Sequence, residues 1–191
     1  MRRIHQALDA IERFFWDSFT DTYLELVKGR ARSESDPAGR SSAVAALRQG
    51  LSILLRLLAP YLPYVTEEAW SWDFAGETRK SIHLTPWPEA VELAPLRTSS
   101  EHAEVYALAK GALGAINRAK TQAGGTVGRH VASLTIAAPA KVLDLFARAE
   151  SDIRAATRVL ELERLATPDG PEFDLGTLVK MIELAPVPDR P

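Results

Sequence analysis

Apolar residues recur every three or four positions in the first part of the chain, a spacing that predicts helices. The first stripe fades near Gly29 and consists of Ile4, Leu8, Ile11, Phe15, Phe19, Tyr23 and Leu26. The polar stretch ARSESDPAGRSS predicts a loop, and Ser41 or Ser42 at its end is suited to cap a second helix. This second helix is expected to end at Pro60 and Pro63, because proline lacks the amide that a helix interior needs.

The residues after Pro63 predict a third helix and a returning segment. Thr66 is expected to cap the short helix TEEAWSWDF, with Glu67 and Glu68 at its positive end. SIHLTPWP is expected to be extended and to fold back over the helices. A proline-rich and polar stretch follows, and it favours a first domain over 1–90 and a linker over 91–100.

The remainder, 101–191, has a mixed pattern that predicts a long helix and a small α+β domain. The helix covers about 101–122 and ends at GGTVG. VASLTIAA and RVLELERLAT alternate as strands do, while Pro139 is suited to open one helix and Ser151 to cap another. PDGP predicts a turn, and TLVKMIELA predicts a last strand, with a helix as the alternative. The predicted fold class is therefore mainly α, followed by a small α+β element.

Composition excludes several classes of function. The chain has 191 residues, of which 46% are hydrophobic and 25% charged, the balance of a soluble globular protein. It has no cysteine, which excludes disulfides, thiolate metal sites and a cysteine nucleophile. No apolar run approaches the roughly 20 residues that span a bilayer. The N-terminus does not resemble a signal peptide, so we expect a cytoplasmic protein without membrane contact.

Catalytic signatures are absent as well. The sequence has no GxxxxGK[ST], GxGxxG, HExxH or GxSxG motif, and its four histidines are widely separated. We therefore predict no catalytic residues and no metal site, and an independent small enzyme is the least favoured function.

The distribution of charge is more informative than the net charge of −2. No acidic residue occurs between Val105 and Leu143, a stretch that contains Lys110, Arg118, Lys120, Arg129 and Lys141. A second basic stretch contains Lys28, Arg30, Arg32, Arg40, Arg48 and Arg56 against only Glu34 and Asp36. Such residues either form ordinary solvated surfaces or neutralise phosphate groups of a nucleic acid.

Four segments together carry a family resemblance. FFWDSFTDTYLELVKGRA, LLRLLAPYLPYVTEEAW, SIHLTPWPEA and INRAKTQAGG follow one another in this order. They closely resemble the C-terminal part of valyl-tRNA synthetases, over roughly 1–137 and more loosely over the remainder. The resemblance implies a class I synthetase anticodon-binding helical bundle that binds tRNA(Val). The HIGH and KMSKS signatures of that family are absent here. We therefore expect no aminoacylation by this chain alone and no cofactor in it, because ATP belongs to the parent enzyme.

The resemblance also assigns candidate site residues. Those matching the family's stretch near the anticodon are Lys28, Arg30 and Arg32, with Arg40 in the same loop. In the second region, those expected to touch an outer arm of the RNA are Arg118, Lys120 and Arg129. The family's aromatic positions, expected here in the core, are Trp16, Tyr61, Tyr64, Trp70 and Trp87.

Departures from the family pattern leave two functions open. The chain begins near the family's third bundle helix, so the bundle is expected to be incomplete, with an uncovered apolar face that favours self-association. The chain is either a fragment, docked in cis on the catalytic body of the synthetase, or a free-standing relative. Our leading hypothesis is a tRNA-binding module, and the alternative is a structural or protein-interaction domain that no longer binds tRNA.

Overall fold

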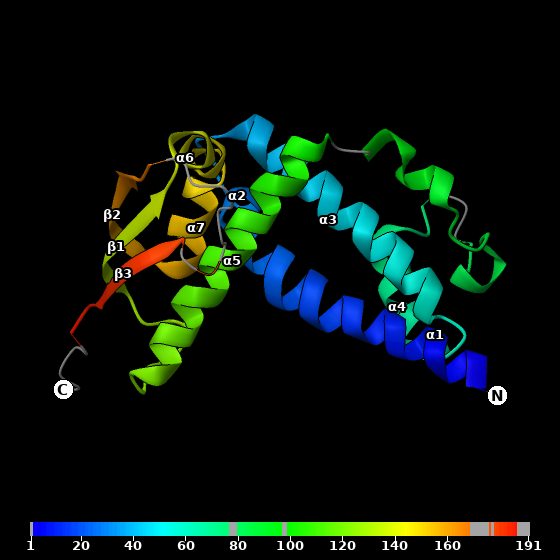
Figure 1. The fold of residues 1–191 in the computed structure, drawn as a ribbon. Helices are drawn as coiled ribbons and strands as arrows, with labels where there is room; N and C mark the ends of the chain where they lie inside the picture. Colours follow the sequence, from blue (N-terminus) through cyan, green and yellow to red (C-terminus); the bar gives the residue numbers. More distant parts are fainter. Residues whose placement is uncertain (1, 77–79, 97–98, 169–175, 177, 187–191) are drawn as a thin grey trace. The chain divides into compact units, whose positions relative to one another are not determined.

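The computed structural model of the chain describes residues 2–76, 80–96, 99–168, 176 and 178–186. The chain divides into two compact units (Figure 1). Unit 1 comprises Met1–Glu25 and Arg30–Arg97, and unit 2 comprises Leu26–Gly29 and Thr98–Pro191. Unit 1 is helical, and unit 2 combines helices with a three-stranded sheet, so the predicted fold class is confirmed.

The first predicted helix is present but is not a simple α-helix. It consists of α1 (Arg2–Arg13), the π-helix η1 (Phe14–Leu24) and α2 (Glu25–Ala31). Within η1 the hydroxyl of Thr22 donates to the carbonyl of Asp17, five residues earlier, at 2.7 Å. The three-to-four periodicity predicts helical structure here but contains no signal for the wider π turn. The ring of Phe19 stacks on that of Tyr23, with centroids 6.3 Å apart.

The second helix, α3 (Pro37–Leu58), begins earlier than predicted. The carboxylate of Asp36 accepts a hydrogen bond from the amide of Gly39 at 2.9 Å and caps the helix. Ser41 and Ser42 therefore lie inside the helix, and the prediction that one of them caps it was wrong. Pro37 is at the first helical position, where its missing amide costs nothing.

The third helix, α4 (Pro63–Asp73), also begins at a proline rather than at its predicted cap. Thr66 is buried within the helix, and its hydroxyl donates to the carbonyl of Leu62 at 2.8 Å. Glu67 does not cap the helix either. Its carboxylate accepts from the hydroxyl of Ser81 at 2.8 Å and from the amide of Ile82 at 2.9 Å. Glu67 thus fastens the returning segment to α4.

The returning segment folds back over the helices as predicted, but it is not extended throughout. It contains the 3₁₀ turn η2 (Ile82–Leu84), and a second 3₁₀ helix, η3 (Ala90–Leu96), follows it. The side chain of Ile82 is 3% exposed and completes an apolar cluster with Leu55, Ala59 and Trp70. The short 3₁₀ turn at η2 places the side chain of Ile82 in the core.

Most of the aromatic residues expected in the core of unit 1 are not buried. Trp70 is 8% exposed and belongs to the core. Tyr64, in contrast, is 91% exposed, and Trp16 and Trp87 are 55% and 56% exposed. Tyr61 is half-buried, and its hydroxyl donates to the carbonyl of Ile4 at 3.4 Å. The prediction of a core position was therefore wrong for Tyr64, Trp16 and Trp87.

Helix α3 is the one helix among the described residues with the length and composition to cross a membrane. Its arginines argue against this. Arg48 pairs with Asp73 of α4 at 2.6 Å, and Arg56 pairs with Glu92 of η3 at 2.6 Å. Two ion pairs with neighbouring elements show that α3 is an integral helix of unit 1.

Unit 2 contains the predicted long helix and the three predicted strands. Its elements are α5 (Ser100–Gln122), β1 (Val131–Ala138), α6 (Ala140–Ala147), α7 (Glu150–Thr157), β2 (Val159–Ala166) and β3 (Val179–Leu184). The strand order is β2-β1-β3, with β1 parallel to β2 and antiparallel to β3. Helices α6 and α7 form the crossover between the parallel strands, as parallel pairing requires (Figure 1). The helical alternative for the last segment is excluded.

The core of unit 2 lies between the sheet and its helices. Fully buried side chains come from α5 (Ile116), β1 (Ile136), α6 (Phe146) and α7 (Ile153). Ser151 lies inside α7, which begins at Glu150, so Ser151 does not cap this helix. The predicted PDGP turn lies largely outside the described residues.

Candidate nucleic-acid interface

The turn between α2 and α3 carries three of the predicted contact residues and is held by its own hydrogen bonds. The amide of Ser33 donates to the carbonyl of Arg30 at 3.1 Å, and the amide of Asp36 donates to the Ser33 hydroxyl at 3.2 Å. The Asp36 carboxylate then caps α3. A Cβ at position 39 would collide with that carboxylate, so a larger residue there would displace the cap. We call residues 30–40 of unit 1 the basic turn.

Arginine side chains of the basic turn differ in exposure. Arg32 and Arg40 are exposed, and neither forms an ion pair with another described residue. Arg30 is half-buried, and its Nε is buried without a hydrogen-bond partner among the described groups. Its carbon chain lies close to Gly39 at the start of α3. The turn therefore presents two free guanidinium groups and one that is partly held by the fold.

Acidic residues only partly offset these charges. Glu34 is exposed in the same turn, while the Asp36 carboxylate is occupied by the helix cap. Residues 30–40 thus contain three arginines against two carboxylates, which leaves a local positive charge. Such a surface attracts phosphate groups, and the attraction weakens as salt is added.

Lys28 does not belong to this turn. It is half-buried and falls in the segment Leu26–Gly29, which is part of unit 2, whereas Arg30 and Arg32 are part of unit 1. Both Lys28 and Arg30 already interact with other groups of the protein. The three residues predicted as the leading RNA contacts are therefore divided between two units and are unequally available.

In unit 2 the structure removes Lys120 from the candidate interface. Its side chain is completely buried, and its Nζ donates to the carbonyls of Val127 at 2.9 Å and Thr157 at 2.8 Å. Burial, together with the nearby Arg158 guanidinium, lowers the pKa of Lys120 from its ordinary value of 10.5. An ammonium group in this position cannot reach an external phosphate, so the prediction for Lys120 is corrected.

Arg129 also donates hydrogen bonds to the backbone of unit 2. Its Nε and Nη2 both donate to the carbonyl of Ala185, at 3.1 and 2.9 Å, just after β3. Arg158, at a positive φ of 57°, donates from Nη1 to the carbonyl of Gly128 at 2.9 Å. Together with Lys120 these residues fasten the glycine loop between α5 and β1, and we call the three side chains the carbonyl clamp.

Arg118 is the predicted residue of unit 2 that stays available. It is exposed and lines a groove of about 340 Å³ between the C-terminal half of α5 and β3. The opposite wall contains Lys180, which sequence reasoning missed. The acid-free stretch of sequence indicated α5, but only the folded structure shows that β3 lies beside that helix. We call this feature the α5–β3 groove.

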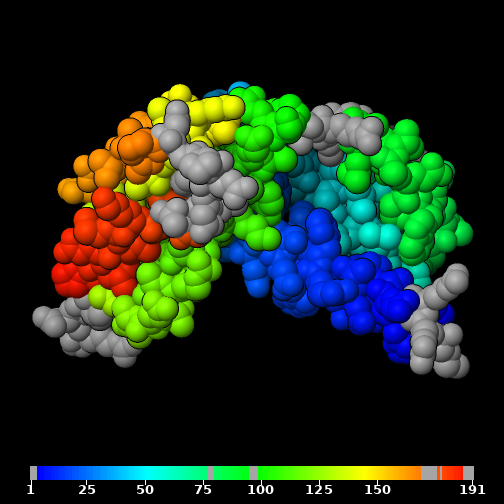
Figure 2. All heavy atoms as spheres, viewed as in Figure 1, coloured from blue at the N-terminus to red at the C-terminus, as the bar shows by residue number. Residues whose placement is uncertain are grey.

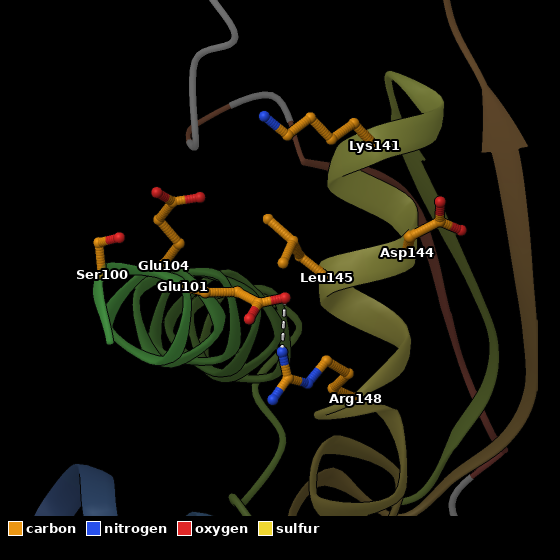
Figure 3. Close-up of a pocket in the computed structure, with 7 residues that line it drawn as sticks. All are labelled: Ser100, Glu101, Glu104, Lys141, Asp144, Leu145 and Arg148. Carbon is orange, nitrogen blue, oxygen red and sulfur yellow. Dashed lines mark ion pairs between the residues drawn. The ribbon is translucent and has the colours of Figure 1, made fainter. Parts of the chain in front are cut away.

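A second hollow of unit 2 has a different character (Figure 3). It lies between the start of α5 and α6 and has a volume of about 410 Å³. Its charges are mixed, since Glu101 pairs with Arg148 at 2.8 Å and Glu104 and Lys141 both border the space. This mixture does not favour a polyanion. Among the described residues, no group of three or more acidic or histidine side chains could hold a metal ion.

The comparisons with known proteins agree with the resemblance seen in the sequence. Residues 2–127 match the family model described as the anticodon-binding domain of tRNA ligase. The chain is 42% identical over 186 residues to a valine–tRNA ligase of Salinispora tropica, an alignment covering 90% of this chain and 21% of the relative. For a valine–tRNA ligase of Leifsonia xyli the identity is 43% over 164 residues, covering 86% and 18%.

A more distant relative gives the same result. A valine–tRNA ligase of Thermobifida fusca is 37% identical over 181 residues, which covers 95% of this chain and 19% of the relative. The chain thus spans about a fifth of the length of these curated relatives. The matched region of the family model includes unit 1 from residue 2 onward, with the basic turn, and α5. The chain therefore belongs to the family of anticodon-binding domains of tRNA ligases, and it is homologous to a part of valine–tRNA ligases.

Proposed function

We propose that this chain is the tRNA-binding module of a valine–tRNA ligase. It holds the anticodon arm of tRNA(Val) while a catalytic body of the synthetase, in cis or in trans, carries out ATP-dependent aminoacylation in the cytoplasm. The observation that carries the proposal is the family match over residues 2–127, which includes the basic turn.

The geometry of the basic turn supports phosphate contact. Arg32 and Arg40 are exposed and pair with no described acid, so their guanidinium groups are available to phosphate oxygens. Guanidinium groups bind phosphates through two parallel hydrogen bonds, which also fixes orientation. Contacts of this kind position the RNA, whereas discrimination among tRNAs requires contacts with unpaired anticodon bases. The module itself makes and breaks no covalent bond.

The direct test is binding of the full chain to tRNA(Val) over a series of salt concentrations. Reversing both charges, with Arg32→Glu and Arg40→Glu, is expected to weaken binding at least tenfold and to reduce the salt dependence. The matched control reverses Arg13 and Lys80, two exposed cations of unit 1 outside the turn. Equal losses in both double variants, or equal affinity of the wild-type chain for unrelated tRNAs, would contradict the proposal.

A second candidate function, a protein-interaction domain, is favoured by the apolar surface of unit 1. Helix α4 exposes Tyr64, Val65 and Trp72 at 91%, 59% and 75%. Exposed apolar groups of this size suit a protein partner, either the catalytic body of the synthetase or a second copy of the chain. If this is the sole function, Tyr64→Ser with Trp72→Ser abolishes association seen by light scattering at ~100 μM, while the charge reversals leave RNA binding unchanged.

A further inference from the structure

The α5–β3 groove is a basic surface built from two elements of unit 2. Its helical wall contains Ala115, Arg118, Ala119 and Gln122, and its strand wall contains Lys180 and Met181. The four helical residues are spaced by three or four, so they share one face of α5. Figure 2 shows β3, in red, beside the light-green C-terminal end of α5 at the surface of this unit.

The chemistry of the groove favours an extended anion. Its lining contains two cations, the amide of Gln122 and no acidic side chain. Ala115 and Ala119 are small, which allows a polymer backbone to approach the helix closely. Met181 is 56% exposed and offers an apolar contact for a sugar or a base.

The other described arginines of unit 2 and its buried lysine are held by acids or carbonyls, whereas Lys110 and Lys141 are exposed outside the groove. Arg148 pairs with Glu101, and Arg154 and Arg164 both pair with Glu150. The carbonyl clamp accounts for Lys120, Arg129 and Arg158. Arg118 and Lys180, in contrast, face one groove from two elements, and neither pairs with any residue that the structure describes.

We propose that the α5–β3 groove binds the phosphodiester backbone of RNA and forms a second contact, separate from the basic turn. The inference rests on the proposed function, because it assumes that the chain binds tRNA, and it adds a site and a residue, Lys180, to that function. An inorganic phosphate ion has the same oxygen chemistry, but it cannot contact the two cations and the exposed thioether of Met181 at the same time.

The test measures binding of fluorescently labelled tRNA(Val) to the full chain by anisotropy, at several salt concentrations. Reversing both groove charges, with Arg118→Glu and Lys180→Glu, is expected to weaken binding about tenfold. The slope of log affinity against log salt is expected to fall by about 1.5 to 2, because two phosphate contacts are lost. The matched control reverses Lys110 and Lys141, two exposed lysines of the same unit outside the groove, and far-UV circular dichroism checks that each variant is folded.

The outcomes separate this inference from the function on which it rests. If the wild-type chain binds no RNA, the proposed function and the inference both fail. If it binds RNA but the groove variant behaves like the control, the inference alone is wrong. Inorganic phosphate is expected to compete with tRNA binding to the wild type more strongly than with binding to the groove variant, and equal competition for both would also overturn the inference.

A photo-crosslinking measurement gives independent support. A benzophenone amino acid in place of Gln122, in the groove wall, is expected to crosslink to tRNA(Val). The same group in place of Glu161, an exposed position on β2, is the control and is expected to give no crosslink. Crosslinks of equal yield at both positions would contradict a localised groove contact.

Discussion

The two units differ in how they use apolar side chains. Of the seventeen large apolar residues exposed among the described part of the chain, thirteen lie in unit 1. Of the eleven largest fully buried side chains, nine lie in unit 2. A sheet covered by helices closes its own core, whereas a few packed helices leave much apolar surface outside. Unit 2 therefore encloses its own core, whereas unit 1 leaves much of its apolar surface exposed.

The units also differ in how they use positive charge. In unit 2 the three cations of the carbonyl clamp donate hydrogen bonds to backbone carbonyls, and these bonds stabilise the fold. In unit 1 the basic turn is held by serine and aspartate groups, and Arg32 and Arg40 stay exposed. The comparison shows that the neighbouring elements decide whether a cation in a basic stretch of sequence stabilises the fold or stays exposed.

Removing a large side chain from the closed core should have the largest effect. Phe146 is fully buried, and Phe146→Ala is expected to lower the free energy of unfolding by about 4 kcal/mol. Trp72→Ala, at a side chain 75% exposed in unit 1, is expected to change it by less than about 0.5 kcal/mol. Urea unfolding followed by circular dichroism measures both values.

The same variant tests whether the units unfold independently. All four tryptophans lie in unit 1, so tryptophan fluorescence reports that unit alone, while circular dichroism reports both. Phe146→Ala is expected to shift the dichroism transition and to leave the fluorescence transition in place. Coincident shifts of both signals would show that the two units unfold as one cooperative structure and would contradict their independence.

The next largest effect is expected at the carbonyl clamp. Lys120→Met keeps the apolar stem but leaves the carbonyls of Val127 and Thr157 without their donor, at a cost of about 2 to 3 kcal/mol. Lys110→Met, at an exposed lysine of the same helix, is the control and should be nearly neutral. An unchanged stability of Lys120→Met would show that the clamp does not hold unit 2 together.

The clamp also predicts a pH dependence of defined sign. The pKa of Lys120 in the folded chain is lower than its ordinary value of 10.5, so between these two values the unfolded chain binds more protons. The stability of the wild type relative to Lys120→Met is therefore expected to rise with pH in that window. A neutral amine still has two N–H groups for the two carbonyls. A decrease in this stability difference over the same pH range would contradict the buried position of Lys120.

A smaller effect is expected at the cap that orders the basic turn. Asp36→Ala removes the acceptor for the amide of Gly39 and should cost about 1 kcal/mol. Glu34→Ala, in the same turn but without a cap, is the control and should be nearly neutral in stability while strengthening RNA binding slightly. If Asp36→Ala also weakens RNA binding despite the gain of positive charge, the order of the turn contributes to binding.

The smallest effect is expected at the ion pair between Arg56 and Glu92. Hydrogen bonds from Arg56 and from the amide of Glu89 lower the pKa of Glu92 below its ordinary value of 4.5. The stabilisation from the ion pair is present above pH 4.5 and is lost as the pH falls through the lowered pKa of Glu92. Glu92→Gln should cost about 0.5 kcal/mol at neutral pH and progressively less in acid. A cost independent of pH would show that packing, not charge, is responsible.

Local patterns in the sequence were enough to predict most of the secondary structure. The alternation in VASLTIAA and the three-to-four spacing on α5 depend on which face each side chain occupies, and that is a property of the segment itself. Caps were predicted less well. Asp36 and not Ser41 starts α3, because several polar residues near a helix start can each provide an acceptor, and α4 starts at Pro63 without any capping side chain.

The aromatic residues show a further limit of local patterns. Trp70 and Trp72 are two positions apart on α4, yet one is 8% and the other 75% exposed. A side chain of high hydrophobicity predicts burial only if another element covers its face of the helix. Leu55 and Ile82, distant in the sequence, cover Trp70.

By itself, the sequence determined the helices, the strands, the family and the stretches in which positive charge gathers, because these follow from residue type and spacing along the chain. The tertiary structure decided the role of each cation. Lys120 and Arg118 are two residues apart on α5, but α7 places a carbonyl beside the first, and β3 places a second cation across a groove from the other. Burial and charge neighbours depend on segments far apart in the sequence, so only the folded chain separates a cation that stabilises the fold from one that stays exposed.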